Sequence, residues 1–151
     1  MRKLNFLVIV AALCILPAAA HAEFLFEGSI GYGLQVSPSV ATSGYNVMAA
    51  AGVGFLDKIL RLELGVAVNR DQFAGTEYQL RPMVILAPPI IPFYIRGVVA
   101  CADLFSSSRQ FAYGAYLGAE FWWLFAEVGA LPRIINGSTS WTAEARVGLH
   151  I

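Results

Sequence analysis

The residues best suited to chemistry are charged side chains that recur at even spacings. Carboxylates and guanidinium groups can form ion pairs, and two carboxylates can act as acid and base on a sugar. Even spacing places such residues on one face of a β-strand, because successive side chains alternate between faces. Three opposite-charge pairs keep that spacing: Arg61 with Glu63, Glu77 with Arg81, and Glu144 with Arg146. The pattern predicts a shared charged face.

Ten charged residues can be placed on such a face, and we expect them to form a paired network. They are Glu27, Arg61, Glu63, Glu77, Arg81, Arg96, Glu120, Glu127, Glu144 and Arg146. A lone charge in a dry interior is costly, whereas an Arg fork matches a carboxylate with two hydrogen bonds. Glu120 and Glu127 could instead act as acid and base on a sugar, but the arginines on the same face favour salt bridges.

Histidine and cysteine offer little further chemistry. Cys14 and His21 fall within the N-terminal leader described below, so Cys101 and His150 are the only cysteine and histidine of the mature chain. An intrachain disulfide is therefore not expected. A zinc site built from His and Cys ligands is not expected either, and the sequence indicates no cofactor and no metal.

The N-terminus has the organisation of a bacterial secretory signal peptide. It contains the three parts of such a leader: a basic start at Arg2 and Lys3, an apolar core from Leu4 to Leu16, and a cleavage motif at Ala20-His21-Ala22. We expect residues 1–22 to be removed, so that residues 23–151 form the mature protein. Eight basic and ten acidic residues then remain. The mature chain offers no basic patch for nucleic acid and too little charge to cover a soluble domain.

The rest of the chain favours strands over membrane helices. The apolar region from Met83 to Ala102 is interrupted by Pro88, Pro89 and Pro92, which would break a helix. In contrast, apolar and polar residues alternate in the closing sequence WTAEARVGLHI and in several segments before it. That period of two is typical of two-faced β-strands.

Eight such segments can be assigned, each about as long as a tilted strand that crosses a bilayer. They cover residues 24–36, 45–55, 60–70, 76–87, 91–101, 110–121, 123–132 and 140–151. The connections alternate between tight turns (56–59, 88–90 and around Trp122) and longer loops (37–44, 71–75, 102–109 and 133–139). The sequence therefore predicts an all-β fold, an eight-stranded antiparallel up-and-down transmembrane barrel.

The composition of the two faces predicts which one points outward. The charged face is otherwise rich in small residues, including Gly31, Gly33, Gly65 and Gly118, which leave room for long side chains in a narrow lumen. The opposite face carries bulky aliphatic and aromatic residues that suit lipid. Several positions fit this scheme poorly: Pro82 on the lipid face, and Met83, Ile85, Val98, Phe125 and Leu131 in the lumen.

With this layout, residues 23–151 resemble the small outer-membrane β-barrels of Gram-negative bacteria, such as the membrane domain of outer-membrane protein A. The resemblance implies an integral protein of the bacterial outer membrane, in contact with lipid and lipopolysaccharide. It also implies recognition by the barrel assembly machinery through the C-terminal strand, although this chain ends in Ile151 where such signals usually close on Phe or Trp.

The expected role is structural, or that of a narrow channel, with a lumen filled by the Glu/Arg network. Two other roles stay open. Some barrels of this size modify lipopolysaccharide through a Ser/His pair, and His150 is the one candidate base. The longer loops could also bind a partner at the cell surface. We expect no enzymatic activity, because His150 falls at the end of the last strand, where a lumen-facing polar residue explains it.

Overall fold

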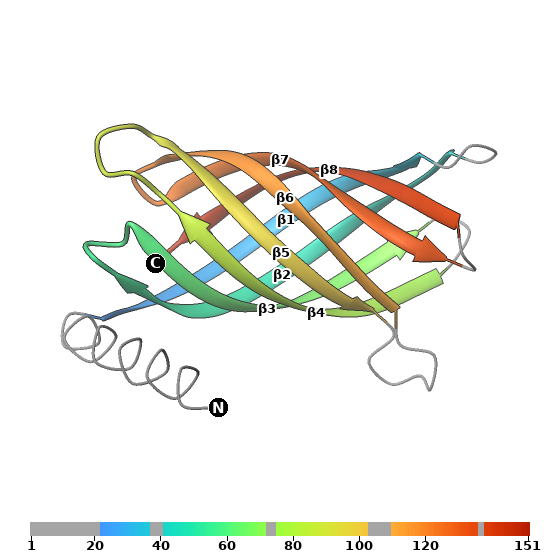
Figure 1. Cartoon of the computed structure of the whole chain (residues 1–151), viewed down its shortest axis with the longest axis horizontal. Coiled ribbons are helices and arrows are strands. Elements are labelled where there is room, and N and C mark those ends of the chain that lie inside the picture. The colour runs from blue at the N-terminus through green and yellow to red at the C-terminus, as the bar shows by residue number, and fades with distance from the viewer. Residues whose placement is uncertain (1–21, 37–40, 72–74, 103–109, 136–137) are drawn as a thin grey trace, which may run out of the picture.

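A computed structural model describes residues 22–36, 41–71, 75–102, 110–135 and 138–151 of the chain (Figure 1). These residues form eight strands: β1 (Glu23–Val36), β2 (Ala41–Phe55), β3 (Leu60–Asp71), β4 (Gly75–Leu86), β5 (Phe93–Ala102), β6 (Gln110–Phe121), β7 (Leu124–Ile135) and β8 (Ser138–His150). In the described part of the chain, no helix has the length and apolar character needed to cross a membrane.

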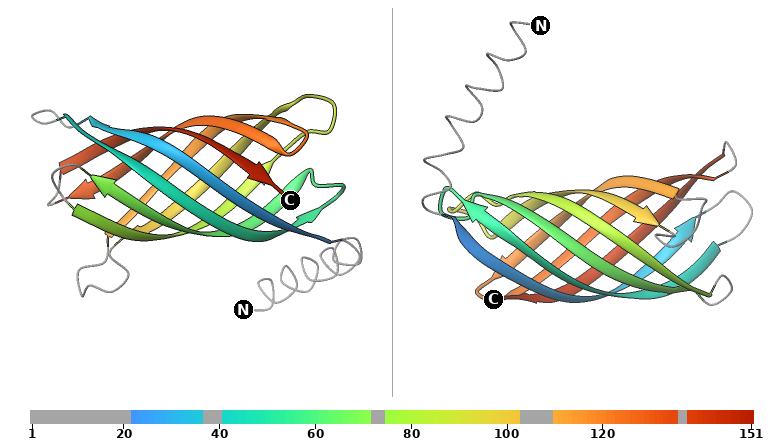
Figure 2. Two further views of the ribbon diagram at one scale, coloured as in Figure 1. Left: turned by 180° about the vertical axis from the view of Figure 1, so that it is seen from behind. Right: turned by 90° about the horizontal axis from the view of Figure 1, so that it is seen from below.

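The strands form a closed barrel in sequence order, with each strand antiparallel to its neighbours (Figure 2). Closure occurs between β1 and β8, whose register runs from Glu27 opposite His150 to Val36 opposite Trp141. Two further backbone hydrogen bonds of 2.9 Å join Phe26 to Ile151. The expected up-and-down barrel is therefore confirmed, and each of the eight described strands is paired on both sides.

The two faces of the sheet differ as the alternation predicts. Along β8, Glu144, Arg146 and His150 are buried in the lumen, while Val147 and Leu149 are exposed on the outside. Glycine and alanine on the lumen side leave space that larger side chains fill, as in other narrow barrels. The outer face is therefore the apolar one, and it is suited to contact with hydrocarbon.

The barrel has two distinct ends. The turn end carries the start of β1, the C-terminus and the connections 56–59, 87–92 and 122–123, and the loop end is the opposite one. Exposed aromatic residues gather toward both ends: Phe24, Phe26, Phe93, Phe121, Trp122 and Trp123 at the turn end, and Tyr32, Tyr45, Tyr78, Phe111, Tyr113 and Trp141 at the loop end. Aliphatic side chains such as Leu64, Val66 and Leu117 are exposed between them. Two aromatic belts around an aliphatic band are typical of barrels that cross a bilayer.

Two of the tight turns place residues other than glycine at positive φ, a backbone conformation that favours glycine. Leu56, Asp57 and Lys58 have φ values of 53°, 55° and 66°, and Ile59 N donates to Leu56 O at 3.1 Å. Trp122 has a φ of 60° in the two-residue turn between β6 and β7. Positive φ is uncommon for residues with large side chains. The closed sheet imposes these turns against the local preference of the residues.

Some boundaries differ from those expected. β2 begins at Ala41 and β7 continues to Ile135, so two of the expected longer loops are shorter than predicted. β5 begins at Phe93 rather than residue 91, because Pro92 has no N–H to donate, although its carbonyl accepts from Glu120 N at 2.7 Å. The tips of the loops lie outside the described residues, as does the predicted signal peptide up to residue 21.

The residues that fit the alternating pattern poorly lie on the faces that strand parity predicts for them. Met83, Ile85, Val98, Phe125 and Leu131 are all buried inside the barrel. Pro82 lies on the outer face, and the pairing of β4 with β5 is interrupted there, between the pairs Leu80–Cys101 and Met83–Val98. The lost ladder hydrogen bond is the local consequence of a proline within a strand.

Candidate functional site: a charged network across the barrel lumen

Two ion pairs cross the full width of the lumen. Arg96 on β5 donates to both oxygens of Glu27 on β1, at 2.9 and 2.6 Å. Arg81 on β4 donates to both oxygens of Glu144 on β8, at 3.1 and 3.0 Å. In each case the partners are four strands apart in an eight-strand ring, so they face each other across the barrel. Such two-pronged contacts are the strong form of the Arg–carboxylate interaction.

Glu127 on β7 connects the centre of the network. Arg96 Nε lies 3.1 Å from its carboxylate, and Arg146 forms an ion pair with it. Tyr94 donates its hydroxyl to the same carboxylate at 2.7 Å. Arg96 and Glu127 are both almost fully buried, so the centre of the lumen contains charge that is removed from water and is compensated locally.

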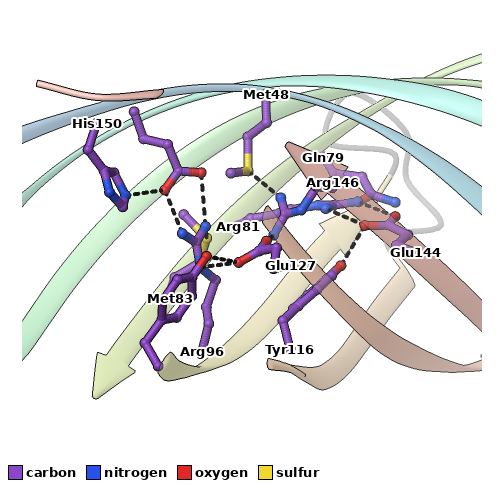
Figure 3. A network of polar contacts seen from close by, with 12 residues as sticks. Met48, Gln79, Arg81, Met83, Arg96, Tyr116, Glu127, Glu144, Arg146 and His150 are labelled. Atoms are coloured by element: carbon purple, nitrogen blue, oxygen red, sulfur yellow. Dashed lines mark hydrogen bonds and ion pairs between the residues drawn. The ribbon is translucent and has the colours of Figure 1, made fainter. Parts of the chain in front are cut away.

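At the turn end the network continues through the imidazole of His150. Its Nε2 lies 3.2 Å from Glu27, and its Nδ1 lies 3.3 Å from Glu120. Arg61 forms an ion pair of 2.8 Å with the other oxygen of Glu120. Figure 3 shows His150 at one end of the network and Glu144 at the other.

Toward the loop end, neutral polar side chains join the network beside the Arg81–Glu144 ion pair. Tyr116 donates to Glu144 at 2.5 Å, and Arg81 Nε donates to Gln79 at 2.8 Å. Gln79 in turn donates to the half-buried Glu77 at 3.1 Å. The charged groups therefore form a chain of contacts that extends along most of the lumen.

Aromatic rings and glycines complete the packing around the charges. The Arg146 guanidinium carbon lies 4.4 Å from the centre of the Tyr116 ring, a cation–π contact. Gly129 lies against the Tyr116 ring, and Gly118 against the ring of Tyr94; a Cβ at either position would overlap these rings. The glycines therefore make room for rings as well as for the charged side chains that the sequence suggested.

The structure brings most of the predicted residues into direct contact. Eight take part in ion pairs with one another: Glu27, Arg61, Arg81, Arg96, Glu120, Glu127, Glu144 and Arg146. Glu77 joins through hydrogen bonds with Gln79 and Asn69. Glu63 is the exception, because it is buried in the lumen and neither of its oxygens accepts a hydrogen bond from a described residue.

Sequence reasoning did not assign Tyr94 and Tyr116 to the network. Both could have been found by strand parity, since Tyr94 is two positions from Arg96 and Tyr116 is four positions from Glu120. His150 was expected to face the lumen, but its two carboxylate partners were not foreseen. Its partners come from β1 and β6, and pairing across a barrel depends on strand stagger that no local pattern contains.

The chain was compared with known proteins. No protein-family profile and no curated protein matches it. Among solved structures, it is similar to Neisserial surface protein A, with a TM-score of 0.59 and 16% identity over 86% of this chain and 97% of that one. It is also similar to the Yersinia pestis outer-membrane protein Ail, with a TM-score of 0.53 and 14% identity over 83% of this chain and 99% of that one.

A third similar structure is the N-terminal β-barrel domain of Pseudomonas aeruginosa OprF, with a TM-score of 0.50 and 18% identity over 83% of this chain and 97% of that one. At such low identities the likeness establishes the fold alone. The chain thus has the fold of small eight-stranded outer-membrane barrels. Together with the apolar outer face and its aromatic belts, this fold agrees with the expected integral location in the bacterial outer membrane.

Proposed function

We propose that this protein is a structural barrel of the bacterial outer membrane whose lumen is closed by its own ion-pair network. The observation that carries the proposal is the pair of two-pronged contacts, Arg96 with Glu27 and Arg81 with Glu144, that cross the lumen at two levels. Eight strands enclose a space that side chains can fill, and here they do so with charge and rings. Passage of ions requires these contacts to separate, so the resting barrel is closed or opens only rarely.

Planar-bilayer recording tests this proposal. The wild-type protein is expected to be silent or to show rare, small openings. The double variant Glu27→Ala with Arg96→Ala removes one crossing without leaving its partner unpaired, and it is expected to open more often. The matched control is Lys58→Ala with Glu23→Ala, which removes an ion pair of 2.9 Å that is largely exposed. Steady, large conductance in the wild-type protein would contradict a closed lumen.

The proposed role is not enzymatic. His150 is the one histidine of the described residues, and its two nitrogens face Glu27 and Glu120. No hydrogen bond joins it to a serine among the residues that the structure describes. The enzymatic alternative would be favoured if the purified wild-type barrel released acyl chains from lipopolysaccharide and a His150→Gln variant did not.

The proposed partners follow from the surface of the barrel. Its outer face is suited to outer-membrane lipid, and the loop end is where contact with lipopolysaccharide is expected. We infer that β8 serves as the signal for the barrel assembly machinery, because its outward residues Val147, Leu149 and Ile151 form an exposed apolar row at the C-terminus. A surface-binding role would fall on loop tips outside the described residues.

A further inference from the structure

Glu63 is the one lumen carboxylate that the network does not use. Its residue is 5% exposed, and both side-chain oxygens lack a hydrogen-bond donor among the described residues. A buried carboxylate without a partner is strongly destabilising. Because Glu63 accepts no hydrogen bond from the described residues, a proton or a bound cation is expected to neutralise it.

The neighbours of Glu63 form a set of possible ligands. One carboxylate oxygen of Glu63, one of Glu27 and one ring nitrogen of His150 all lie within 4.8 Å of one another, and all three residues are buried. They come from β3, β1 and β8, which the closed barrel holds in place. Carboxylate oxygens and imidazole nitrogen are common ligands of divalent transition metals, including Zn²⁺.

The orientation of His150 fits a ligand role. Its Nδ1 faces Glu120 at 3.3 Å, while its Nε2 faces Glu27 at 3.2 Å. If the Nδ1 proton is donated to Glu120, the lone pair of Nε2 points toward Glu27. Histidines that bind metals usually donate their second N–H to a carboxylate in this way. Arg61, at 2.8 Å from Glu120, holds that carboxylate in position.

The charge of the lumen can accommodate a cation. Among the side chains that the structure describes, six carboxylates line it (Glu27, Glu63, Glu77, Glu120, Glu127 and Glu144) against four guanidinium groups (Arg61, Arg81, Arg96 and Arg146). With His150 protonated the excess is one negative charge, which a proton on Glu63 would remove; with His150 neutral, as a metal ligand must be, the excess is two. One divalent cation balances that excess of two, so the charge of the lumen is compatible with a bound metal ion and a neutral His150.

The cluster lies near a cavity at the turn end. A cavity of about 340 Å³ lies there, between the turns 56–59 and 87–92, and its walls include Arg61 and Glu120. Glu120 is half-buried, and it lies between this cavity and His150. An ion that enters from the turn end would have to pass the contacts of Glu120 with Arg61 and His150, but not the ion pairs that close the middle of the lumen.

From these contacts we propose that Glu27, Glu63 and His150 form a binding site for a divalent transition-metal ion of the Zn²⁺ type. Arg96 retains its hold on Glu27 through the second oxygen of that carboxylate, and Glu120 orients His150. The site goes beyond the structural role proposed above. It also differs from the His/Cys zinc site that the sequence argues against, because it draws mainly on carboxylates.

The test uses the full mature barrel in detergent micelles, stripped of metal by a chelator and titrated with ZnCl₂ by calorimetry. We expect one Zn²⁺ per chain. X-ray absorption at the zinc edge should then show only nitrogen and oxygen ligands at about 2.0–2.2 Å. Glu63→Gln keeps the size of the side chain but not its charge, and it should abolish the saturable binding. Glu120→Ala should weaken affinity by about 10- to 100-fold, the usual effect of losing a partner of a ligating histidine.

Glu23→Gln is the control, because Glu23 is an exposed carboxylate at the turn end that lies outside the lumen network; its Zn²⁺ affinity should equal that of the wild-type protein. Undiminished affinity in Glu63→Gln, or no saturable binding by the wild-type protein, would overturn the site and leave a proton as the group that neutralises Glu63. Neither result would alter the bilayer recordings that test the closed lumen, so the two proposals fail separately.

Discussion

Arg81 and Glu144 are 63 positions apart in the sequence, yet they meet through two parallel hydrogen bonds of 3.1 and 3.0 Å across the centre of the barrel. The residue exposure of Arg81 is 0%, and that of Glu144 is 6%. Tyr116 donates a further hydrogen bond of 2.5 Å to the same carboxylate. The contact therefore joins two buried groups that have little alternative hydration.

Replacement of Arg81 by Ala should strongly destabilise the barrel. The change leaves Glu144 buried without its main partner, and we expect a loss of about 3–5 kcal/mol in the free energy of unfolding. Urea unfolding in lipid vesicles, followed by tryptophan fluorescence, measures this value. Arg70→Ala is the control, because Arg70 is exposed at the loop end of β3. An unchanged unfolding midpoint in Arg81→Ala would contradict a buried ion pair.

Tyr116→Phe should remove one hydrogen bond while keeping the ring that packs against Arg146. Hydrogen bonds to charged groups contribute about 1.5–3 kcal/mol, and the free energy of unfolding should fall by that amount. Tyr113→Phe provides a matched control on the same strand, because Tyr113 is 59% exposed on the outer face. Equal unfolding midpoints for the two variants would show that the Tyr116 hydroxyl adds nothing.

Gly118→Ala should interfere with packing inside the barrel. An added Cβ would overlap the ring of Tyr94, and we expect a loss of about 1–3 kcal/mol, as for other overpacked cores. Gly28→Ala is the control, because a Cβ there meets nothing within 4 Å. Both variants can be compared by the temperature at which the folded band disappears in heat-dependent gel mobility. A lower temperature for Gly28→Ala than for Gly118→Ala would reverse the expected order.

Cysteine labelling tests which face meets lipid. In a Cys101→Ala background, Val66→Cys and Val147→Cys should resist a membrane-impermeant thiol reagent in intact vesicles, because both positions lie on the apolar outer face. Asp57→Cys in the exposed turn should react in vesicles or after detergent extraction, according to orientation. Free reaction at both valine positions in intact vesicles would show that the outer face meets water.

The sequence predicts the faces of the strands well and the contacts across the lumen poorly. Alternation along each strand identified the residues of β8 that face the lumen. It also placed Met83 and Phe125 in the lumen, because a period of two is a local property of the strand. Alternation could not show that Arg96 would pair with Glu27, or that Glu63 would accept no hydrogen bond from the described residues. Those contacts depend on the tilt and stagger of strands that are distant in the chain.

The two crossings also bear on how the barrel is assembled. One joins β1 to β5 and the other joins β4 to β8. An incomplete sheet that lacks β8 therefore leaves Arg81 without Glu144, and one that lacks β1 leaves Arg96 without Glu27. Contacts between distant parts of a chain form late and cost loop entropy before they stabilise anything. Partly inserted intermediates are therefore penalised, and membrane insertion and ring closure should occur together as one cooperative event.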